Sequence, residues 1–448
     1  MTAVPTHRLI EAKVPRYTSY PTAPHFHDGV TSRMVAGWIG ALAADEAISL
    51  YLHIPFCDRL CWFCACHTKQ TLRYGPVSDY LATLHSEIIL LGRHLSGRGI
   101  VRAIHLGGGS PTMIRPDDLQ SLFQQLHANL TIAADASVSV EIDPNDMDEA
   151  LLDALARVGT TRASLGIQDF DPRVQKAINR EQGFEITRDI VDGLRARGVG
   201  SVNLDLLYGL PFQTVATLGK TIDLSLSLRP DRVAIFGYAH VPWFKKHQTM
   251  IDEAALPDPD SRLEQAQSAA ALIRKAGYQP IGIDHFALPT DSLAIAARKG
   301  RLTRNFQGYT DDPCETLIGL GPSSISRFRE GYAQNTPSTG EYSRLIEAGS
   351  LAIARGLSLS EDDRLRGWVI ERLMCDFGFS SIALRNTFGE SAEPILREAA
   401  MLAQVSPHFV ADDGGFSIKR ESRLFARSIA AHFDTYLNTE KARHSAAI

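Results

Sequence analysis

The sequence predicts an α/β fold in which a parallel sheet curves into a partial, open βα barrel. Three observations point to it: short apolar runs alternate with amphipathic helical stretches, each run has one apolar and one polar face, and polar residues or cysteines follow the runs. Alternation of this kind is typical of parallel βαβ units. We also expect an N-terminal arm and a small, mainly helical C-terminal domain.

The elements follow one another in a regular order along the chain. We predict strands at residues 48–54, 101–106, 137–142, 162–167, 201–207, 232–236 and 279–283, with helices at 78–95, 116–130, 184–197 and 260–277. After about residue 355 the alternation gives way to mostly helical sequence with one hairpin at 409–418. The predicted organisation is an arm over residues 1–35, a partial-barrel catalytic domain over 36–358 and a helical domain over 359–448.

The two faces of the predicted strands differ in polarity. Leu50, Leu52 and Ile54 share one face of the first strand, while Tyr51 and His53 share the other. The same division recurs in the next four strands. A doubly wound sheet buries both faces, and a closed eight-stranded barrel fills its interior with apolar side chains. A polar inner face therefore favours an open barrel around something large and polar; a half-exposed antiparallel sheet is the alternative.

Composition and charge exclude several classes of protein. Lys and Arg total 46 against 51 for Asp and Glu, a net charge of −5 without a basic run, so we expect no nucleic-acid partner. No apolar stretch approaches the roughly 18 residues of a membrane span, and the first residues do not resemble a secretory signal. The protein is therefore expected in the cytoplasm.

Four of the six cysteines fall within ten residues: Cys57, Cys61, Cys64 and Cys66. In a reducing compartment such a cluster indicates metal binding or catalysis rather than disulfides. Zinc sites usually pair ligands from two loops, and no second pair stands out, which makes zinc the lesser alternative. Three thiolates on one loop could hold three irons of a 4Fe-4S cluster and leave the fourth iron to a non-protein ligand. The single residue between Cys64 and Cys66 would strain ligation by both.

Chemically useful residues lie where the predicted strands end. In a parallel barrel the carboxyl ends of the strands meet at one rim, where the functional loops lie. The cysteine loop, residues 107–112, Glu141, Gln168 and Asp205 all fall on that rim. We expect the site there.

The cysteine loop, with Phe63 before its third cysteine, resembles the cluster loop of radical S-adenosylmethionine (SAM) enzymes. Within that superfamily the chain resembles the oxygen-independent coproporphyrinogen III oxidases. The matching segments span nearly the whole chain: residues 16–22, Cys66, 107–112, 141–144, 168–170, 179–182, 205–211, 238–240, 284–286, 304–309 and 432–436.

The resemblance implies a radical SAM type of barrel, a 4Fe-4S cluster and one or two SAM molecules. Cys57, Cys61 and Cys64 would ligate the cluster, and SAM would chelate the open iron. Cys66 and Tyr51 would be catalytic. The residues implied to surround SAM are Phe63, Gly108, Gly109, Ser110, Glu141, Gln168, Arg180 and Asp205, and those beside a second SAM are Tyr51, Gln168, Asp205, Ala239 and Ile325.

The implied reaction converts two propionates of coproporphyrinogen III to vinyl groups and gives protoporphyrinogen IX. A substrate with four carboxylates needs cationic or hydrogen-bonding partners, for which Arg is well suited. The candidates are Arg16 and Tyr17 on the arm, and Arg304 and Asn305 after the last barrel strand.

Two rival functions within the superfamily are a haem chaperone and an anaerobic haem-modifying enzyme. Haem chaperones of this kind generally lack a cysteine at position 66 and the arm motif at 16–20, whereas haem-modifying relatives typically diverge in the arm and tail. The presence of Cys66 and the arm motif favours the oxidase. As partners we expect a flavodoxin- or ferredoxin-like electron donor and an unidentified electron acceptor, and we expect a monomer.

Overall fold

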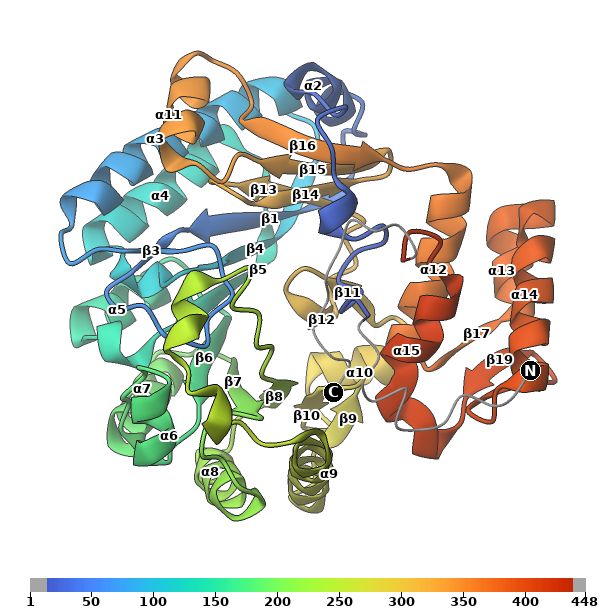
Figure 1. Ribbon diagram of the computed structural model, residues 1–448. Helices are drawn as coiled ribbons and strands as arrows, with labels where there is room; N and C mark the ends of the chain where they lie inside the picture. Colours follow the sequence, from blue (N-terminus) through green and yellow to red (C-terminus); the bar gives the residue numbers. More distant parts are fainter. Residues whose placement is uncertain (1–13, 438–448) are drawn as a thin grey trace.

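The computed structural model describes residues 14–437. Its main sheet has twelve strands in the order β16-β15-β14-β13-β1-β4-β5-β6-β7-β8-β10-β9, and the two outer strands do not pair with each other (Figure 1). The barrel is therefore open, as predicted. Six central parallel strands match predicted runs: β1 (Ala47–Ile54), β4 (Ile100–Gly108), β5 (Ile132–Ile142), β6 (Arg162–Gln168), β7 (Ser201–Tyr208) and β8 (Arg232–Gly237).

The edges of the sheet differ from the prediction. On one side β13 (Thr316–Leu320) pairs parallel with β1, and β14 (Ile325–Phe328), β15 (Gly331–Asn335) and β16 (Ile353–Ser358) continue antiparallel. On the other side β10 (His285–Ala287) pairs antiparallel with β8, and β9 (Gln279–Ile281) pairs antiparallel with β10. The strand predicted at 279–283 is present as β9, but β10 separates it from β8, because the chain doubles back after Ile281 without a crossover helix.

Amphipathic helices cover the outer face of the sheet (Figure 1). Leu50, Leu52 and Leu106 are at most 1% exposed beneath them, and burial of each such side chain contributes roughly 1.5–3 kcal/mol. α8 begins at a capping box between Thr214 and Thr217. The helices of the barrel are α3 (Gly75–Leu95), α4 (Pro116–Asn129), α5 (Glu149–Arg157), α6 (Pro172–Ala177), α7 (Phe184–Ala196), α8 (Val215–Ser227), α9 (Pro259–Lys275), α10 (Ser292–Arg298) and α11 (Thr339–Glu347).

The inner face of the sheet is polar, as the alternation predicted. It encloses a main cavity of about 540 Å³. Polar side chains of β1, β4, β5, β6 and β7 are among those that line this cavity, including Ser49, His105, Ser139, Glu141, Ser164, Asn203 and Asp205. The same parity that sends leucines to the helices therefore sends hydroxyl, imidazole and carboxylate groups inward.

The C-terminal segment forms a second apolar core beside the barrel (Figure 1). It comprises α12 (Glu361–Cys375), β17 (Gly378–Ser380), α13 (Ser381–Phe388), α14 (Ala392–Val405), the hairpin of β18 (Phe409–Asp412) and β19 (Gly415–Ile418), and α15 (Ala426–Ala430). Val14, Tyr17 and Tyr20 pack into this core, whereas Val35 packs into the barrel core. The arm thus joins both cores; the predicted boundaries at residues 35 and 358 stay a prediction.

The remaining elements are short or peripheral: α2 (Ser32–Gly40), β2 (Phe56–Cys57), β3 (Lys69–Gln70), β11 (Thr303–Asn305) and β12 (Gly308–Thr310). β11 and β12 form a hairpin against α12. Within residues 14–437, no helix combines the length and apolar character that crossing a bilayer requires.

Candidate active site

The cysteine loop follows β1 and β2 at the rim of the barrel. Neighbouring segments hold it from two sides: Asn179 Nδ2 donates to the Leu60 carbonyl at 2.9 Å, and Gln248 Nε2 donates to the Phe63 carbonyl at 2.9 Å. Lys245 Nζ donates to the Cys66 carbonyl at 2.9 Å. The supporting segment 241–250 was not singled out from the sequence. All four loop cysteines, Cys57, Cys61, Cys64 and Cys66, line the main cavity.

The thiols of the loop have different electrostatic surroundings. Burial raises the pKa of Cys57 to about 12 and raises that of Cys61, although the Arg180 guanidinium lies 3.8 Å from the Cys61 sulfur. A hydrogen bond from the Cys66 side chain lowers the pKa of Cys64 to about 7. Metal binding requires thiolates, and a bound metal supplies the positive charge that deprotonates buried thiols. Three thiols converging on one cavity therefore fit the predicted iron-sulfur cluster.

The glycine turn after β4 packs tightly against the start of the cysteine loop. Gly108 has φ +116°, and a Cβ on Gly109 would lie 2.5 Å from the Phe56 carbonyl oxygen. The backbone N–H groups of Gly108, Gly109 and Ser110 donate to Glu141 Oε2, the Ile54 carbonyl and the Phe56 carbonyl. Because these donors are used, the turn can offer a ligand backbone carbonyl oxygens, which suit an ammonium group.

Glu141 ends β5 beneath this turn. His105 Nε2 lies 3.2 Å from Glu141 Oε1, and the Gly108 N–H donates to Oε2 at 3.1 Å. Burial alone would raise the pKa of Glu141, but these hydrogen bonds hold it below its ordinary value. The carboxylate is therefore ionised at neutral pH and lines the cavity.

Tyr51 and His53 lie on the inner face of β1 beside Glu141. His53 Nε2 donates to the His67 carbonyl at 2.8 Å, which leaves Nδ1 to accept the Tyr51 hydroxyl at 3.0 Å. Burial lowers the pKa of His53 to about 4, so the ring is neutral. The Tyr51 ring stacks on His105 at 5.7 Å between centroids. Of this stacked pair, His105 lines the main cavity and Tyr51 does not.

Gln168 and Asp205 complete the predicted rim from β6 and β7. Gln168 has φ +66°, where the register of β6 against β7 shifts, and its side chain lines the cavity. The Asp205 carboxylate accepts from Ser164 Oγ at 2.7 Å and Asn203 Nδ2 at 2.8 Å. Burial still raises the pKa of Asp205 above its ordinary value.

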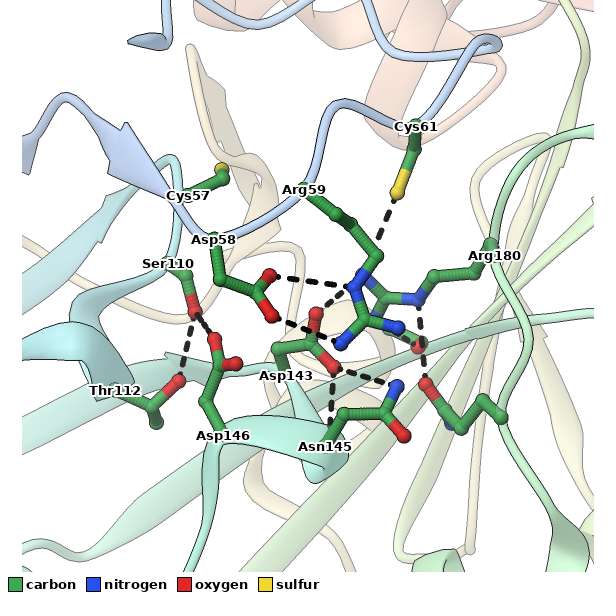
Figure 2. A network of polar contacts seen from close by, with 12 residues as sticks. Cys57, Asp58, Arg59, Cys61, Ser110, Thr112, Asp143, Asn145, Asp146 and Arg180 are labelled. Atoms are coloured by element: carbon green, nitrogen blue, oxygen red, sulfur yellow. Dashed lines mark hydrogen bonds and ion pairs between the residues drawn. The ribbon is translucent and has the colours of Figure 1, made fainter. Parts of the chain in front are cut away.

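Arg180 belongs to a charged network under the cysteine loop (Figure 2). Its Nη1 donates to Asp143 Oδ2 at 2.7 Å, and its Nη2 donates to the Gly166 carbonyl at 2.8 Å. Asp58 is paired with Arg59, and the Ser110 hydroxyl donates to Asp146 at 2.6 Å. The Ser110 hydroxyl therefore serves the protein, and so does the Ser110 carbonyl, which accepts the Met113 N–H at 3.0 Å.

Several predicted residues lie outside the main cavity. The Tyr17 hydroxyl donates to Asp434 Oδ2 at 3.0 Å inside the C-terminal core, and Asn305 Oδ1 accepts the Gln307 N–H at 2.9 Å. Ile325 packs in an apolar cluster with Phe26 and Tyr332. Three predicted residues line a second cavity of about 300 Å³ instead. They are Arg16 on the arm and Arg304 on β11, both expected to bind carboxylates, and Ala239.

The main cavity also contains residues that the sequence analysis missed. Gln307 and Asp311, from the hairpin and the segment after it, reach the cavity, and Asp311 pairs with Arg162 at 3.3 Å. Arg232 forms a buried pair with Asp291 at 2.8 Å. The only sequence signal for Arg162 and Arg232 was their position on the polar face of their strands.

Comparisons with known proteins agree over nearly the full length. The Radical SAM superfamily matches residues 51–225. The chain is 51% identical over 441 residues to coproporphyrinogen III oxidase, anaerobic 1, of Cereibacter sphaeroides, covering 98% of this chain and 97% of the relative. It is 48% identical over 444 residues to the oxygen-independent coproporphyrinogen III oxidase of Paracoccus denitrificans, with 98% of each chain covered. The solved structure of coproporphyrinogen III oxidase from Escherichia coli, described as a radical SAM enzyme, superposes with a TM-score of 0.89 at 36% identity, covering 95% of this chain and 100% of that one.

Proposed function

The chain belongs to the family of oxygen-independent coproporphyrinogen III oxidases in the radical SAM superfamily, and from this premise we propose how its residues carry out the reaction. It is an oxidoreductase whose cofactors are a 4Fe-4S cluster and SAM. It decarboxylates two propionates of coproporphyrinogen III to vinyl groups, giving protoporphyrinogen IX. The observation that carries the proposal is the convergence of three cysteines and the glycine turn on one polar cavity.

We assign the cluster to Cys57, Cys61 and Cys64, with the fourth iron open to SAM. The carbonyls of the glycine turn would accept from the SAM ammonium group, with the ionised Glu141 nearby. Gln168, Arg180 and Asp205 would surround the rest of SAM, as would Phe63. Contacts of Tyr51, Ala239 and Ile325 with a second SAM stay predictions.

Held by Cys57, Cys61 and Cys64, the cluster would supply the electron for reductive cleavage of SAM, chemistry that would provide a 5'-deoxyadenosyl radical to remove a hydrogen atom from the propionate β-carbon. Loss of carbon dioxide and one further electron then leaves the vinyl group. The task of the chain is to hold one C–H bond in reach and to exclude water. The inward hydroxyl, amide and carboxylate groups of β4 to β7 give the cavity the polarity that a carboxylated ring system requires.

The partners beyond the substrate also belong to this proposal. We propose a flavodoxin- or ferredoxin-like protein as the electron donor and leave the final electron acceptor unassigned. The cytoplasmic location and the monomeric state inferred from the sequence stay predictions.

The test is an anaerobic assay of the iron-reconstituted protein with SAM, a strong reductant, an electron acceptor and coproporphyrinogen III. Mass spectrometry should detect two successive losses of carbon dioxide plus two hydrogens, together with 5'-deoxyadenosine. Cys57→Ser serves as the control and should form neither product. If deoxyadenosine forms in the wild type and the tetrapyrrole stays intact, the substrate assignment is wrong, and haem binding is tested next.

A further inference from the structure

The second cavity is lined by four arginines that come from distant parts of the chain. They are Arg16 on the arm, Arg262 on α9, Arg304 on β11 and Arg427 on α15. Guanidinium groups repel one another, and gathering four around about 300 Å³ costs free energy unless anions offset the charge. Such a cavity indicates a site for anionic ligands.

In the described part of the chain, the side chains that line the second cavity do not balance its positive charge. Asp284 is the one carboxylate among the lining residues described, and its Oδ1 already lies 2.7 Å from His285 Nδ1. Burial, together with the charges of Arg16 and Arg304, lowers the pKa of Arg427 to about 10. Four guanidiniums against one carboxylate leave room for further negative charge.

Arg304 gives the most direct sign of a missing partner. Arg304 is 7% exposed, and its Nε and Nη1 have no hydrogen-bond partner among residues 14–437. Only Nη2 donates, to the Arg16 carbonyl at 3.3 Å, while the guanidinium lies 4.3 Å above the Tyr309 ring. A buried guanidinium with two unused donors is costly, and a carboxylate is the group that its planar fork fits.

The two cavities are neighbours. Phe236 lines both, and the Phe236 and His285 rings meet edge to face at 5.4 Å between centroids. His285 lines the main cavity, and Asp284, the preceding residue, lines the second. A ligand with carboxylates on opposite sides of a wide ring can therefore present one group to each cavity.

We propose that the second cavity binds the carboxylates of the tetrapyrrole that are not reacting, while the reacting propionate lies in the main cavity. The inference rests on the proposed function and adds Arg262 and Arg427 to the arginines expected from the sequence. The arginines of the second cavity would then orient the substrate from a site separate from the cysteine loop and the glycine turn.

The test uses the full-length, iron-reconstituted protein and three variants: Arg262→Gln, Arg304→Gln and Arg304→Lys. Arg427 is left intact because two of its nitrogens donate to the Val14 and Pro15 carbonyls and so hold the arm, whereas Arg262 donates to the Tyr238 carbonyl at 2.9 Å and does not hold the arm. The matched control is Arg274→Gln, an exposed arginine on the same helix as Arg262. Each protein is titrated with coproporphyrin III and, separately, with SAM, and its iron content and melting temperature are measured. KM for coproporphyrinogen III is then determined.

Loss of a charge-assisted hydrogen bond to the substrate should weaken coproporphyrin III binding and raise KM by about tenfold or more in both Gln variants. Arg304→Lys should recover part of the loss, and Arg274→Gln should behave as wild type. Iron content and SAM affinity should stay within about twofold of wild type in all.

Two results would overturn the proposal. One is folded Arg262→Gln protein that binds coproporphyrin III as tightly as wild type; this variant keeps the test valid where Arg304→Gln fails to fold. The other is a loss of SAM affinity in the Arg262 and Arg304 variants with intact tetrapyrrole binding, which would show that the cavity binds the SAM carboxylate. If the titrations succeed and the wild type leaves coproporphyrinogen III unchanged, the proposed function fails and the carboxylate site stands.

Discussion

Cys66 differs from the other cysteines of its loop in exposure and in what it contacts. It is exposed at the cavity, and its backbone N–H donates to the Cys64 sulfur at 3.3 Å. One residue of separation is too short for Cys64 and Cys66 to occupy two corners of a cluster without strain. A thiol so placed can act on the substrate without holding iron.

We predict that Cys66→Ser keeps the cluster and reduces turnover by about a hundredfold or more, the lower end of the range for loss of a proton-transfer group. Iron and sulfide content, the visible absorption of the cluster and the rate of vinyl formation are the measurements. Cys64→Ser is the comparison and should lose iron. Equal iron loss in both variants would make Cys66 a ligand and refute this role.

Position 109 requires glycine because neighbouring atoms leave no room for a Cβ, and not because of its φ angle. An added Cβ would lie 2.5 Å from the Phe56 carbonyl oxygen and 2.7 Å from Thr68 Oγ1, so the turn would have to move. Gly109→Ala should lower the free energy of unfolding by roughly 1–3 kcal/mol and weaken SAM binding. Denaturant unfolding and a SAM titration measure the two effects. In Gly37→Ala of α2 the new Cβ meets nothing within 4 Å, and this control should gain up to about 1 kcal/mol. Wild-type SAM affinity in Gly109→Ala would remove the turn from the SAM site.

The residues of the main cavity were largely predictable from sequence, and those of the second cavity were only partly so. Glu141, Gln168 and Asp205 could be located because strand parity and strand ends fix where side chains point. Arg262 and Arg427 carried no such signal, since a helical arginine is usually solvated and only tertiary packing brings these two together.

At the scale of whole elements, the central strands were predicted and the edges were not. Each central strand is a run of alternating polarity followed by a helix, and that pattern is local. β13 (Thr316–Leu320) is a short buried run whose partner, β1, lies more than 260 residues earlier in the chain. β10 reverses direction because a short turn, rather than a helix, precedes it, and strands of three residues leave little periodicity to detect.

The added strands β13 to β15 are tied to α3 through Glu87. This buried carboxylate accepts from the Gly321 N–H at 2.7 Å, the Tyr342 hydroxyl at 2.7 Å and Asn335 Nδ2 at 2.8 Å. Burial raises the pKa of Glu87 to about 7, and the three hydrogen bonds offset only part of that effect. The native state therefore retains a proton on Glu87 between pH 4.5 and 7, where the unfolded state loses it.

The contribution of protonated Glu87 to stability is complete below about pH 4.5 and is lost as pH rises through 7. Glu87→Gln cannot ionise. As pH rises from 4.5 to 7, the free energy of unfolding of the wild type should therefore fall by about 3 kcal/mol relative to that of the variant. Melting temperatures of both proteins from pH 5 to 8 test this. The control is Glu347→Gln on the exposed face of α11. A difference that stays constant with pH would refute the assignment of Glu87.

At the scale of the whole molecule, the arm connects the barrel to the C-terminal core. Arg427 Nε and Nη2 donate to the Pro15 and Val14 carbonyls at 3.1 and 2.8 Å, and the Tyr17 hydroxyl donates to Asp434. Burial and the adjacent Asp434 raise the pKa of Tyr17, so it remains a donor. Tyr17 was expected at the substrate, and its contacts instead indicate that it positions the adjacent Arg16 at the second cavity.

Tyr17→Phe should therefore affect the substrate through the arm. We expect it to lower the free energy of unfolding by about 1–2 kcal/mol and to raise KM for coproporphyrinogen III severalfold, while iron content and SAM affinity stay unchanged. A double-mutant cycle with Asp434→Asn should give a coupling energy of about 1 kcal/mol or more, because one hydrogen bond joins the two side chains. Tyr74→Phe removes another Tyr–Asp hydrogen bond, to Asp118 on the barrel's outer helices. This control should lose stability without a change in KM. If Tyr17→Phe, like this control, lowers stability without changing KM, the C-terminal core supports folding and does not position the substrate.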